Sequence, residues 1–268
     1  MNAPERPAAP ADQDEPLILT RRDGPIARLT LNRPRQYNVL SEAMLDALQA
    51  ALAELAADPA VRVVVLGAAG KAFCAGHDLG QMRADPRIDY YQWLFARCTK
   101  VMMAIQRMPQ VVIARVHGLA TAAGCQLVAM CDLAVAADDA RFAVSGINVG
   151  LFCATPSVAL SRNVSRKQAF EMLVTGEFID AAQAAARGLV NHAVPAAELD
   201  QTIAALARTI CAKPAPAIAA GKGLFYRQLE MGIEAAYQAA GQTMACNMVE
   251  PCAQEGVQAF LEKRAPRW

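Results

Sequence analysis

The first part of the chain alternates hydrophobic and polar positions as a β-hairpin does. Residues 17–31 alternate on both sides of Asp23-Gly24, a dipeptide that favours a two-residue turn between antiparallel strands. After Pro34 the period changes. Ser41 suits the N-cap of a helix, and the leucines at positions 45, 48, 52 and 55 then recur at helical spacing. The pattern predicts a hairpin and then a helix that ends at Asp58-Pro59.

Two continuous apolar runs, residues 61–66 and 111–116, are typical of strands that are covered on both faces. Each run leads into a stretch of small residues, 71–79 after the first and 117–127 after the second. The following pattern predicts a helix over residues 122–130 and short strands over 133–136 and 141–144. Strands and helices therefore recur in order, which favours an α/β fold built as a spiral of ββα units.

The last part of the chain is helical in pattern. Residues 156–206 are mostly helical, with one short strand near 190–194, and Lys213-Pro-Ala-Pro216 marks a break in composition. We therefore expect a core over residues 17–206 and a C-terminal helical oligomerisation region over residues 207–268. Helices are predicted there over residues 217–230, 233–247 and 255–263. Residues 1–16 hold four prolines and no apolar stretch, which predicts a disordered tail.

Charge and composition narrow the function classes. With 26 basic and 25 acidic residues the net charge is +1, so no overall field favours nucleic acid or an anionic membrane. The uncharged run 143–161 is interrupted by glycine and proline, so we expect no membrane span. The eight cysteines lack paired C-x-x-C spacing, and we expect no metal site. The N-terminus resembles neither a signal nor a transit peptide, so we expect a cytoplasmic protein.

The small residues of the two stretches suggest the chemistry of the site. Ala75 and Gly76 in the first stretch, and Ala122 to Gly124 in the second, would let a ligand touch main-chain N–H groups directly. The second stretch also begins a helix, whose first turn carries unpaired N–H donors. Two such donors that converge on one oxygen form an oxyanion hole.

At these residues the chain resembles the crotonase (enoyl-CoA hydratase/isomerase) superfamily. The similar motifs are Asn32 to Asn38, Phe73 to Leu79, Gly118 to Asp132 and the ending Phe260 to Arg264. The resemblance implies a crotonase-like spiral with a C-terminal helical trimerisation region, a homotrimer or hexamer, and an acyl-CoA thioester as ligand. Coenzyme A would enter as part of the substrate, with no separate cofactor, and the activity would be of the lyase or isomerase class in fatty-acid metabolism.

The same resemblance implies the site residues. The backbone N–H groups of His77 and Ala123 would form the oxyanion hole, and Gln126 is a tentative catalytic residue. Substrate contacts would come from Arg35, Tyr37, Val39, Ala75, Gly76, Asp78, Leu79, Leu119, Gly124, Ser145, Gly146, Asn148 and Lys263. Residues 83–91 correspond to a mobile flap over the acyl chain in the family, where Tyr90 and Tyr91 would line the pocket.

The chain departs from the superfamily at its two proton-transfer positions. A hydratase of this type carries two glutamates, and the aligned residues here are Gln126 and Gly146, with Ser145 where proline is usual. Neither exchanges protons as a carboxylate does. The run Gly118 to Leu127 and the run Asn148 to Cys153 are most similar to the subfamily named enoyl-CoA hydratase domain-containing protein 3.

Three functions therefore stay open at this point. The first is a crotonase-type enzyme whose reaction needs no glutamate pair, such as thioester hydrolysis, decarboxylation or isomerisation. The second is a weak hydratase, and the third is a non-catalytic acyl-CoA-binding protein. The side chains of His77, Asp78 and Cys153 are expected to be structural. A residue that donates through its backbone N–H needs no particular side chain, and no histidine is placed by the sequence to activate the Cys153 thiol.

Overall fold

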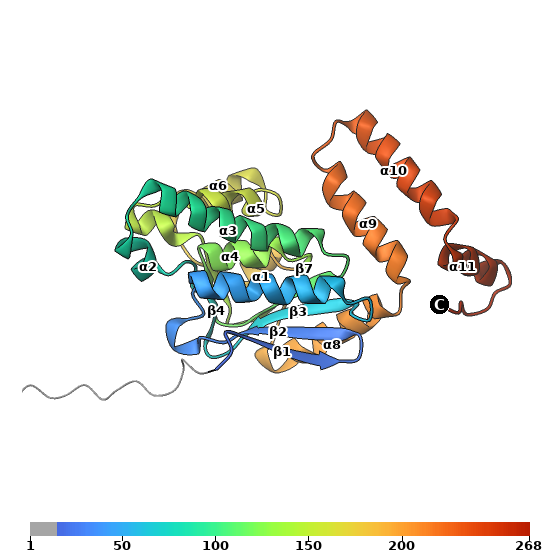
Figure 1. The fold of residues 1–268 in the computed structure, drawn as a ribbon, viewed down its shortest axis with the longest axis horizontal. Coiled ribbons are helices and arrows are strands. Elements are labelled where there is room, and N and C mark those ends of the chain that lie inside the picture. Colours follow the sequence, from blue (N-terminus) through green and yellow to red (C-terminus); the bar gives the residue numbers. More distant parts are fainter. Residues whose placement is uncertain (1–14) are drawn as a thin grey trace, which may run out of the picture.

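A computed structural model of the protein describes residues 15–268 (Figure 1). Most of the predicted disordered tail therefore lies outside the described residues. Where the description begins, the chain contacts the core: the Asn32 side-chain amide donates to Glu15 Oε2 at 3.0 Å and to the Pro16 carbonyl at 3.1 Å. The last two residues of the predicted tail are thus held against the core by Asn32.

The predicted hairpin and first helix are present. Strands β1 (Ile18–Asp23) and β2 (Ile26–Leu31) pair in antiparallel fashion, and Gly24 takes a positive φ of 55° in the turn. Helix α1 (Glu42–Ala57) begins where expected, because the Ser41 hydroxyl accepts a hydrogen bond from the Met44 N–H at 3.2 Å.

The following strands are distributed over two sheets in a way that makes the chain a spiral. One sheet has the order β1-β2-β3-β5-β7-β10 and the other the order β4-β6-β8-β9. Each of three successive strand pairs gives one strand to each sheet, and the pairings among β3, β5 and β7 and among β4, β6 and β8 are parallel. These strands are β3 (Val63–Ala68), β4 (Ala72–Cys74), β5 (Val111–Val116), β6 (Leu119–Thr121), β7 (Leu133–Ala137), β8 (Arg141–Ala143), β9 (Ile179–Asp180) and β10 (His192–Val194).

The larger sheet is covered on both faces, as its apolar strands predict. Val64 and Leu66 of β3 belong to a core with the leucines of α1 and with α3 (Ile88–Arg107). Val63 and Val65 point the other way and pack with α8 (Leu199–Cys211), which Figure 1 shows on the opposite side of the sheet. The predicted boundary after residue 206 falls within α8, whose buried Ala207 belongs to this second core.

Shorter helices connect these strands. They are η1 (Pro34–Gln36), α2 (Leu79–Ala84), α4 (Ala123–Met130), η2 (Ser145–Val149), α5 (Ala154–Leu160), α6 (Arg166–Thr175), α7 (Ala181–Ala186) and η3 (Ala196–Glu198). Helix α4 is buried along almost its whole length and lies between β6 and the core helices. It carries the second of the two predicted donor loops into the centre of the molecule.

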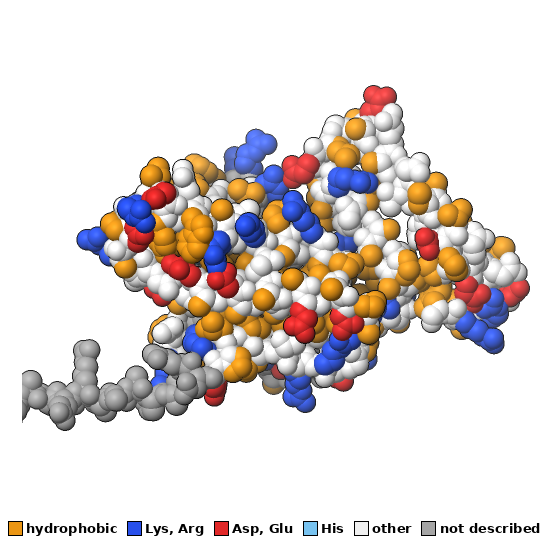
Figure 2. Space-filling view, in the orientation of Figure 1, with side chains coloured by type: hydrophobic (Ala, Val, Ile, Leu, Met, Phe, Trp, Pro, Cys, Tyr) orange, Lys and Arg blue, Asp and Glu red, His pale blue; other side chains and the backbone are white. Residues whose placement is uncertain are grey.

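The C-terminal helices α9 (Ala215–Gln228), α10 (Ile233–Met248) and α11 (Pro251–Leu261) extend away from the core (Figure 1). Hydrophobic side chains are visible over their surface in Figure 2. The large apolar residues that are exposed there in the single chain are Phe225, Leu229, Ile233, Tyr237, Met244, Met248, Val249, Val257, Phe260 and Leu261. These helices leave much more apolar surface uncovered than a completed core does.

Within residues 15–268, no individual helix has the length and apolarity that crossing a membrane would need. Residues 196–211 and 215–228 would together meet that test by length and composition, with a bend of 104° between them.

Candidate active site

The two donor loops meet because β4 and β6 are parallel neighbours, so their carboxyl ends open at the same edge of the sheet. Gly76 lies at the point of contact. A Cβ atom placed on Gly76 would lie 2.9 Å from the Ala122 Cβ and 3.3 Å from the Ala123 nitrogen. Its φ of 95° also disfavours any residue with a side chain. The first loop therefore packs directly on the backbone that carries the second donor.

Ala122 directs that donor through an unusual conformation. Its φ of 50° and ψ of −120° are rare for a residue with a Cβ, and such strain is concentrated at functional sites. The Ala122 N–H donates to the Ala143 carbonyl at 2.9 Å, which fixes the turn. Behind it, a Cβ on Gly124 would lie only 2.1 Å from the Cys74 carbonyl oxygen, so α4 can approach β4 this closely only with glycine there.

His77 and Ala123 both line a cavity of about 470 Å³. Among the described residues, neither N–H has a hydrogen-bond acceptor. Ala123 is the first residue of α4, where the N–H has no partner within the helix. The two residues predicted to supply the donors therefore line one cavity, and their role as a pair of donors stays a prediction.

The His77 side chain is packed in the cavity wall. Its ring lies edge-on to Phe95, with 5.5 Å between ring centroids, and both ring nitrogens are shielded without a hydrogen-bond partner among the described residues. Burial lowers the pKa of His77, and the Leu40 backbone acts in the opposite direction. A neutral, shielded imidazole agrees with the expectation that residue 77 contributes its backbone and not its ring.

Asp78 also lines the cavity, but its carboxylate has a structural task. Oδ1 accepts hydrogen bonds from the Gly80 N–H at 2.9 Å and the Gln81 N–H at 3.2 Å, which caps α2. The expected turn cap is therefore present.

The wall opposite the donors is formed by residues 145–156 and is largely apolar. Ser145 is tied to Thr121 by a hydroxyl–hydroxyl hydrogen bond of 2.8 Å. A Cβ on Gly146 would lie 2.5 Å from the Leu151 carbonyl oxygen and 2.8 Å from Cys153 Sγ, so this position has no room for any larger residue. Burial raises the pKa of the Cys153 thiol, although a hydrogen bond with the Gly146 backbone acts in the opposite direction. The raised pKa keeps the thiol protonated.

Gln126 does not line this first cavity. It lies 6% exposed on α4 and faces a second cavity of about 670 Å³, and its Oε1 has no partner among the described residues. Thr155 lines both cavities. The structure therefore separates the two positions where a hydratase would carry glutamates, since Gly146 faces the first cavity and Gln126 the second.

The other predicted contact residues divide into two groups. Val39, Ala75 and Leu79 line the first cavity with the residues already described. Gly76 and Gly124 shape the loops behind it. The remaining predicted contacts do not line it in the single chain; they are Arg35, Tyr37, Leu119, Asn148 and Lys263. Lys263 follows α11, which lies far from the core helices in Figure 1.

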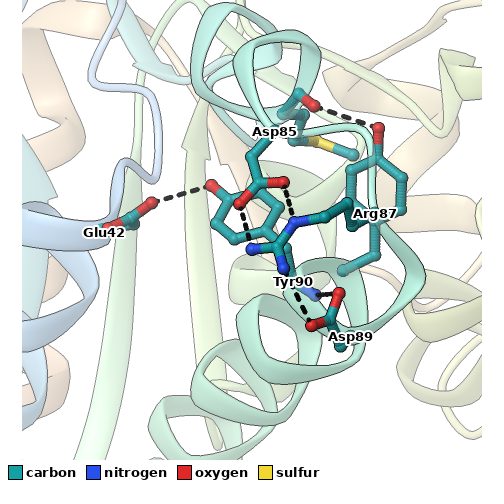
Figure 3. Close-up of polar contacts among 7 residues, drawn as sticks. Glu42, Asp85, Arg87, Asp89 and Tyr90 are labelled. Atoms are coloured by element: carbon teal, nitrogen blue, oxygen red, sulfur yellow. Dashed lines mark hydrogen bonds and ion pairs between the residues drawn. The ribbon is translucent and has the colours of Figure 1, made fainter.

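The segment expected to form a mobile flap makes several polar contacts (Figure 3). Arg87 pairs with Asp85 at 2.7 Å and with Asp89 at 3.2 Å, and α3 begins at the next residue, Ile88. The Tyr90 hydroxyl donates to Glu42 Oε1 at 2.8 Å. The Tyr91 hydroxyl bonds to the Met82 carbonyl, so neither tyrosine lines the cavity as predicted.

Sequence reasoning missed most of the apolar wall. Met82 and Phe95 come from α2 and α3, and Leu151, Phe152 and Thr155 come from the segment around the start of α5. Leu151 and Phe152 are large apolar residues that follow within six positions of Gly146, the second glutamate position. This was the sequence signal that could have located the wall. Within the described part of the chain, no group of three His, Cys, Asp or Glu side chains could hold a metal ion.

Comparison with known proteins gives a consistent result. Residues 21–268 match the family model described as enoyl-CoA hydratase/isomerase. The chain is 44% identical over 256 residues to the enoyl-CoA hydratase domain-containing protein 3, mitochondrial, of Xenopus laevis, covering 96% of this chain and 87% of that protein. The human protein of the same name is also 44% identical, with 96% and 84% covered.

Solved structures agree with the sequence comparison. The crystal structure of an enoyl-CoA hydratase from Mycobacterium smegmatis has a TM-score of 0.94 and 67% identity, covering 95% of this chain and 99% of that one. The structure of human enoyl-CoA hydratase domain-containing protein 3 has a TM-score of 0.91 and 45% identity, covering 94% and 100%. The predicted crotonase-like fold and the resemblance to this subfamily are confirmed.

One expectation is wrong. A cytoplasmic location was predicted from the N-terminal composition, whereas the curated relatives of Xenopus laevis, Rattus norvegicus and Homo sapiens are named as mitochondrial proteins. Composition of the first residues was too weak a signal for that prediction. Two loops with free amides on one cavity, a spiral of ββα units and a match over residues 21–268 lead to one conclusion: the chain belongs to the enoyl-CoA hydratase/isomerase family.

Proposed function

We propose that this protein binds an acyl-CoA thioester with its carbonyl oxygen between the N–H groups of His77 and Ala123, and that it hydrates enoyl-CoA slowly or not at all. The observation that carries the proposal is the close packing at Gly76. A Cβ atom placed on this glycine would lie 3.3 Å from the Ala123 nitrogen. Donors held in this way stabilise the negative charge that develops on the thioester oxygen, and one donor typically contributes about 2.7 to 4 kcal/mol.

Slow hydration follows from the side chains around the reacting carbons. Hydration adds water across a double bond, so it needs one group to activate the water and one to supply a proton, each worth about 10²- to 10⁴-fold. Among the described residues that line the first cavity, the only carboxylate is Asp78, and it caps α2. Reactions that need the polarised carbonyl but no glutamate pair fit better, such as isomerisation, decarboxylation or thioester hydrolysis.

Oligomerisation is part of the same proposal. The uncovered apolar side chains of α9 to α11 would be buried in a homotrimer or in a dimer of trimers, where each apolar Å² removed from water contributes about 25 cal/mol. Light scattering at micromolar concentration should give a mass of three or six chains. A stable monomer would contradict this part of the proposal.

The test of the proposed function uses a thioester labelled with carbon-13 at its carbonyl. A saturated ester such as butyryl-CoA should raise the melting temperature by mass action, and its carbonyl signal should shift when bound, as expected of a polarised C=O. Free CoA should bind without any such signal. Binding with an unshifted carbonyl would mean that the two amides do not receive the oxygen.

A further inference from the structure

The second cavity adjoins the first at Thr155. It is bounded by α3, α4, α5 and α9, encloses about 670 Å³ and shares Thr155 with the cavity that holds the donor amides. Met102, Met103 and Met130 give it an apolar side. Methionine side chains adapt to flexible apolar ligands. Thr155 is therefore the side chain that a ligand held in the first cavity would have to pass to reach this space.

The α9 wall of the second cavity is fixed to the core of the same chain. Lys222 is buried and donates to Asp132 Oδ2 at 2.7 Å, to the Gln110 carbonyl at 2.7 Å and to the Ile105 carbonyl at 2.8 Å. Tyr226, which lines the cavity, donates to Asp132 Oδ1 at 2.8 Å. A buried ion pair with all its partners in place holds this helix in one position, so the cavity is a built feature.

The polar side of this cavity carries unbalanced positive charge. Arg162 is neutralised by Glu230, with Nε and Oε1 2.9 Å apart. Arg107 and Arg227 also line the cavity, and neither has an acidic partner within 4.0 Å among the described residues. Gln126 lines the same cavity, and its Oε1 is buried without a partner among the described residues. Arg107 and Arg227 are exposed at the cavity, so their guanidinium groups are accessible to an anion.

We propose that the second cavity binds the far end of an acyl group that ends in a carboxylate, so that the preferred ligands are CoA esters of dicarboxylic acids. This rests on the proposed function, since the thioester end must occupy the first cavity. The apolar middle of the acyl chain passes Thr155 and contacts the methionines. Its terminal carboxylate then accepts charge-assisted hydrogen bonds from Arg107 and Arg227, whose planar donor groups match a carboxylate in geometry.

The test compares two esters of equal carbon number, adipoyl-CoA and hexanoyl-CoA, by calorimetry on the wild-type protein and on the double variant R107A/R227A. The wild type should bind adipoyl-CoA about 10-fold more tightly, equal to about 1.4 kcal/mol, and rising ionic strength should reduce the preference. The double variant should bind both esters with the affinity that the wild type shows for hexanoyl-CoA. The matched control is R166A/K167A, because those two basic residues line a surface groove and neither of the two cavities.

The outcomes separate this inference from the proposed function. If hexanoyl-CoA binds with a shifted carbonyl signal but adipoyl-CoA has no advantage, the anion site is refuted and the function stands. If neither ester binds, the proposed function itself fails. If R107A/R227A changes the oligomeric state, the two arginines belong to an interface and the anion site is refuted. If R166A/K167A also removes the advantage of adipoyl-CoA, the advantage comes from general surface charge and the anion site is again refuted. Loss of the adipoyl-CoA advantage in millimolar phosphate at constant ionic strength would indicate a general anion site and would also overturn the carboxylate assignment.

Discussion

The two walls of the first cavity differ in what they are made of. The wall at the ends of β4 and β6 presents backbone N–H groups, held by glycines and by the strained Ala122. The wall at residues 145–156 presents side chains, and these are small or apolar. A backbone donor does not depend on the identity of its own side chain, whereas proton transfer does. Carbonyl polarisation and hydration are therefore separable properties, and the proposed function assigns only the first to this chain.

The largest expected effect comes from moving the donor wall. Gly76→Ala adds a methyl group 2.9 Å from the Ala122 Cβ at a φ of 95°, so the two loops must separate. We expect the carbonyl shift of a bound thioester to disappear and any turnover to fall by about 10²- to 10³-fold, the usual cost of one lost donor. The measurement is the carbon-13 signal of labelled butyryl-CoA.

Gly24→Ala is the matched control for that variant. Gly24 also has a positive φ, of 55°, but nothing lies within 4 Å of the added methyl group. It should lower stability by about 1 kcal/mol and leave the carbonyl shift unchanged. Equal loss of the shift in both variants would mean that general destabilisation, and not the contact at Gly76, explains the effect.

On the opposite wall, Gly146→Ala should destabilise the protein by about 1 to 3 kcal/mol, because the methyl group would lie 2.5 Å from the Leu151 carbonyl oxygen. Gly150→Ala is the control in the same turn: its φ of 79° costs conformational strain, but no atom lies within 4 Å. Urea unfolding measures both. A Gly146→Ala protein as stable as wild type would show that the backbone around Leu151 shifts to accept a side chain. Gly146→Glu could then be tested for hydration.

A smaller effect is expected from Gln126→Glu. The new carboxyl group would face the second cavity and not the first, so crotonyl-CoA hydration should not increase measurably. The same change would place a negative charge beside Arg107 and Arg227 and should weaken adipoyl-CoA binding more than hexanoyl-CoA binding. An increase of 10-fold or more in hydration would place Gln126 at the reacting carbons and contradict the geometry described above.

The smallest effect concerns the His77 ring. Burial lowers its pKa, so the unfolded chain, with a pKa of about 6.5, binds the proton more tightly than the folded one. Above about pH 6.5 the ring is neutral in both states, so it adds no pH dependence to the free energy of unfolding. Below that pH the unfolded chain binds the proton first, and the free energy of unfolding falls by at most about 1.4 kcal/mol per pH unit. His77→Phe removes this dependence and keeps the N–H. Urea unfolding at about pH 5.5 and about pH 7.5 should therefore differ less in the variant, with an unchanged carbonyl shift.

Sequence patterns predicted the donor wall better than the opposite one, for a physical reason. The hairpin, the leucine helix and the buried strands follow from local periodicity, and small residues after two buried strands mark the loops. Strand order then brings the loops together without any particular side chain. The contact of Lys222 with Asp132, 90 residues away, depends on tertiary packing that no local pattern encodes.

Helix boundaries show the same limit. The helices predicted over residues 217–230 and 255–263 are observed as Ala215–Gln228 and Pro251–Leu261, each with a proline in its first turn, where proline favours the start of a helix. The direction of Gln126 was also beyond local information, because α4 is buried on nearly all sides and its sequence does not say which cavity each face meets. Alignment with the superfamily identified the residue but not the space that it faces.

The most direct test of the account measures polarisation and hydration on one sample. Wild-type protein is mixed with crotonyl-CoA labelled at the carbonyl carbon, and the bound carbonyl signal and the disappearance of the double bond are followed together. The account predicts a shifted carbonyl signal and hydration at least about 10²-fold below that of a family member with both glutamates, assayed in parallel. Rapid hydration by the wild-type protein, or a bound ester with an unshifted carbonyl, would contradict it.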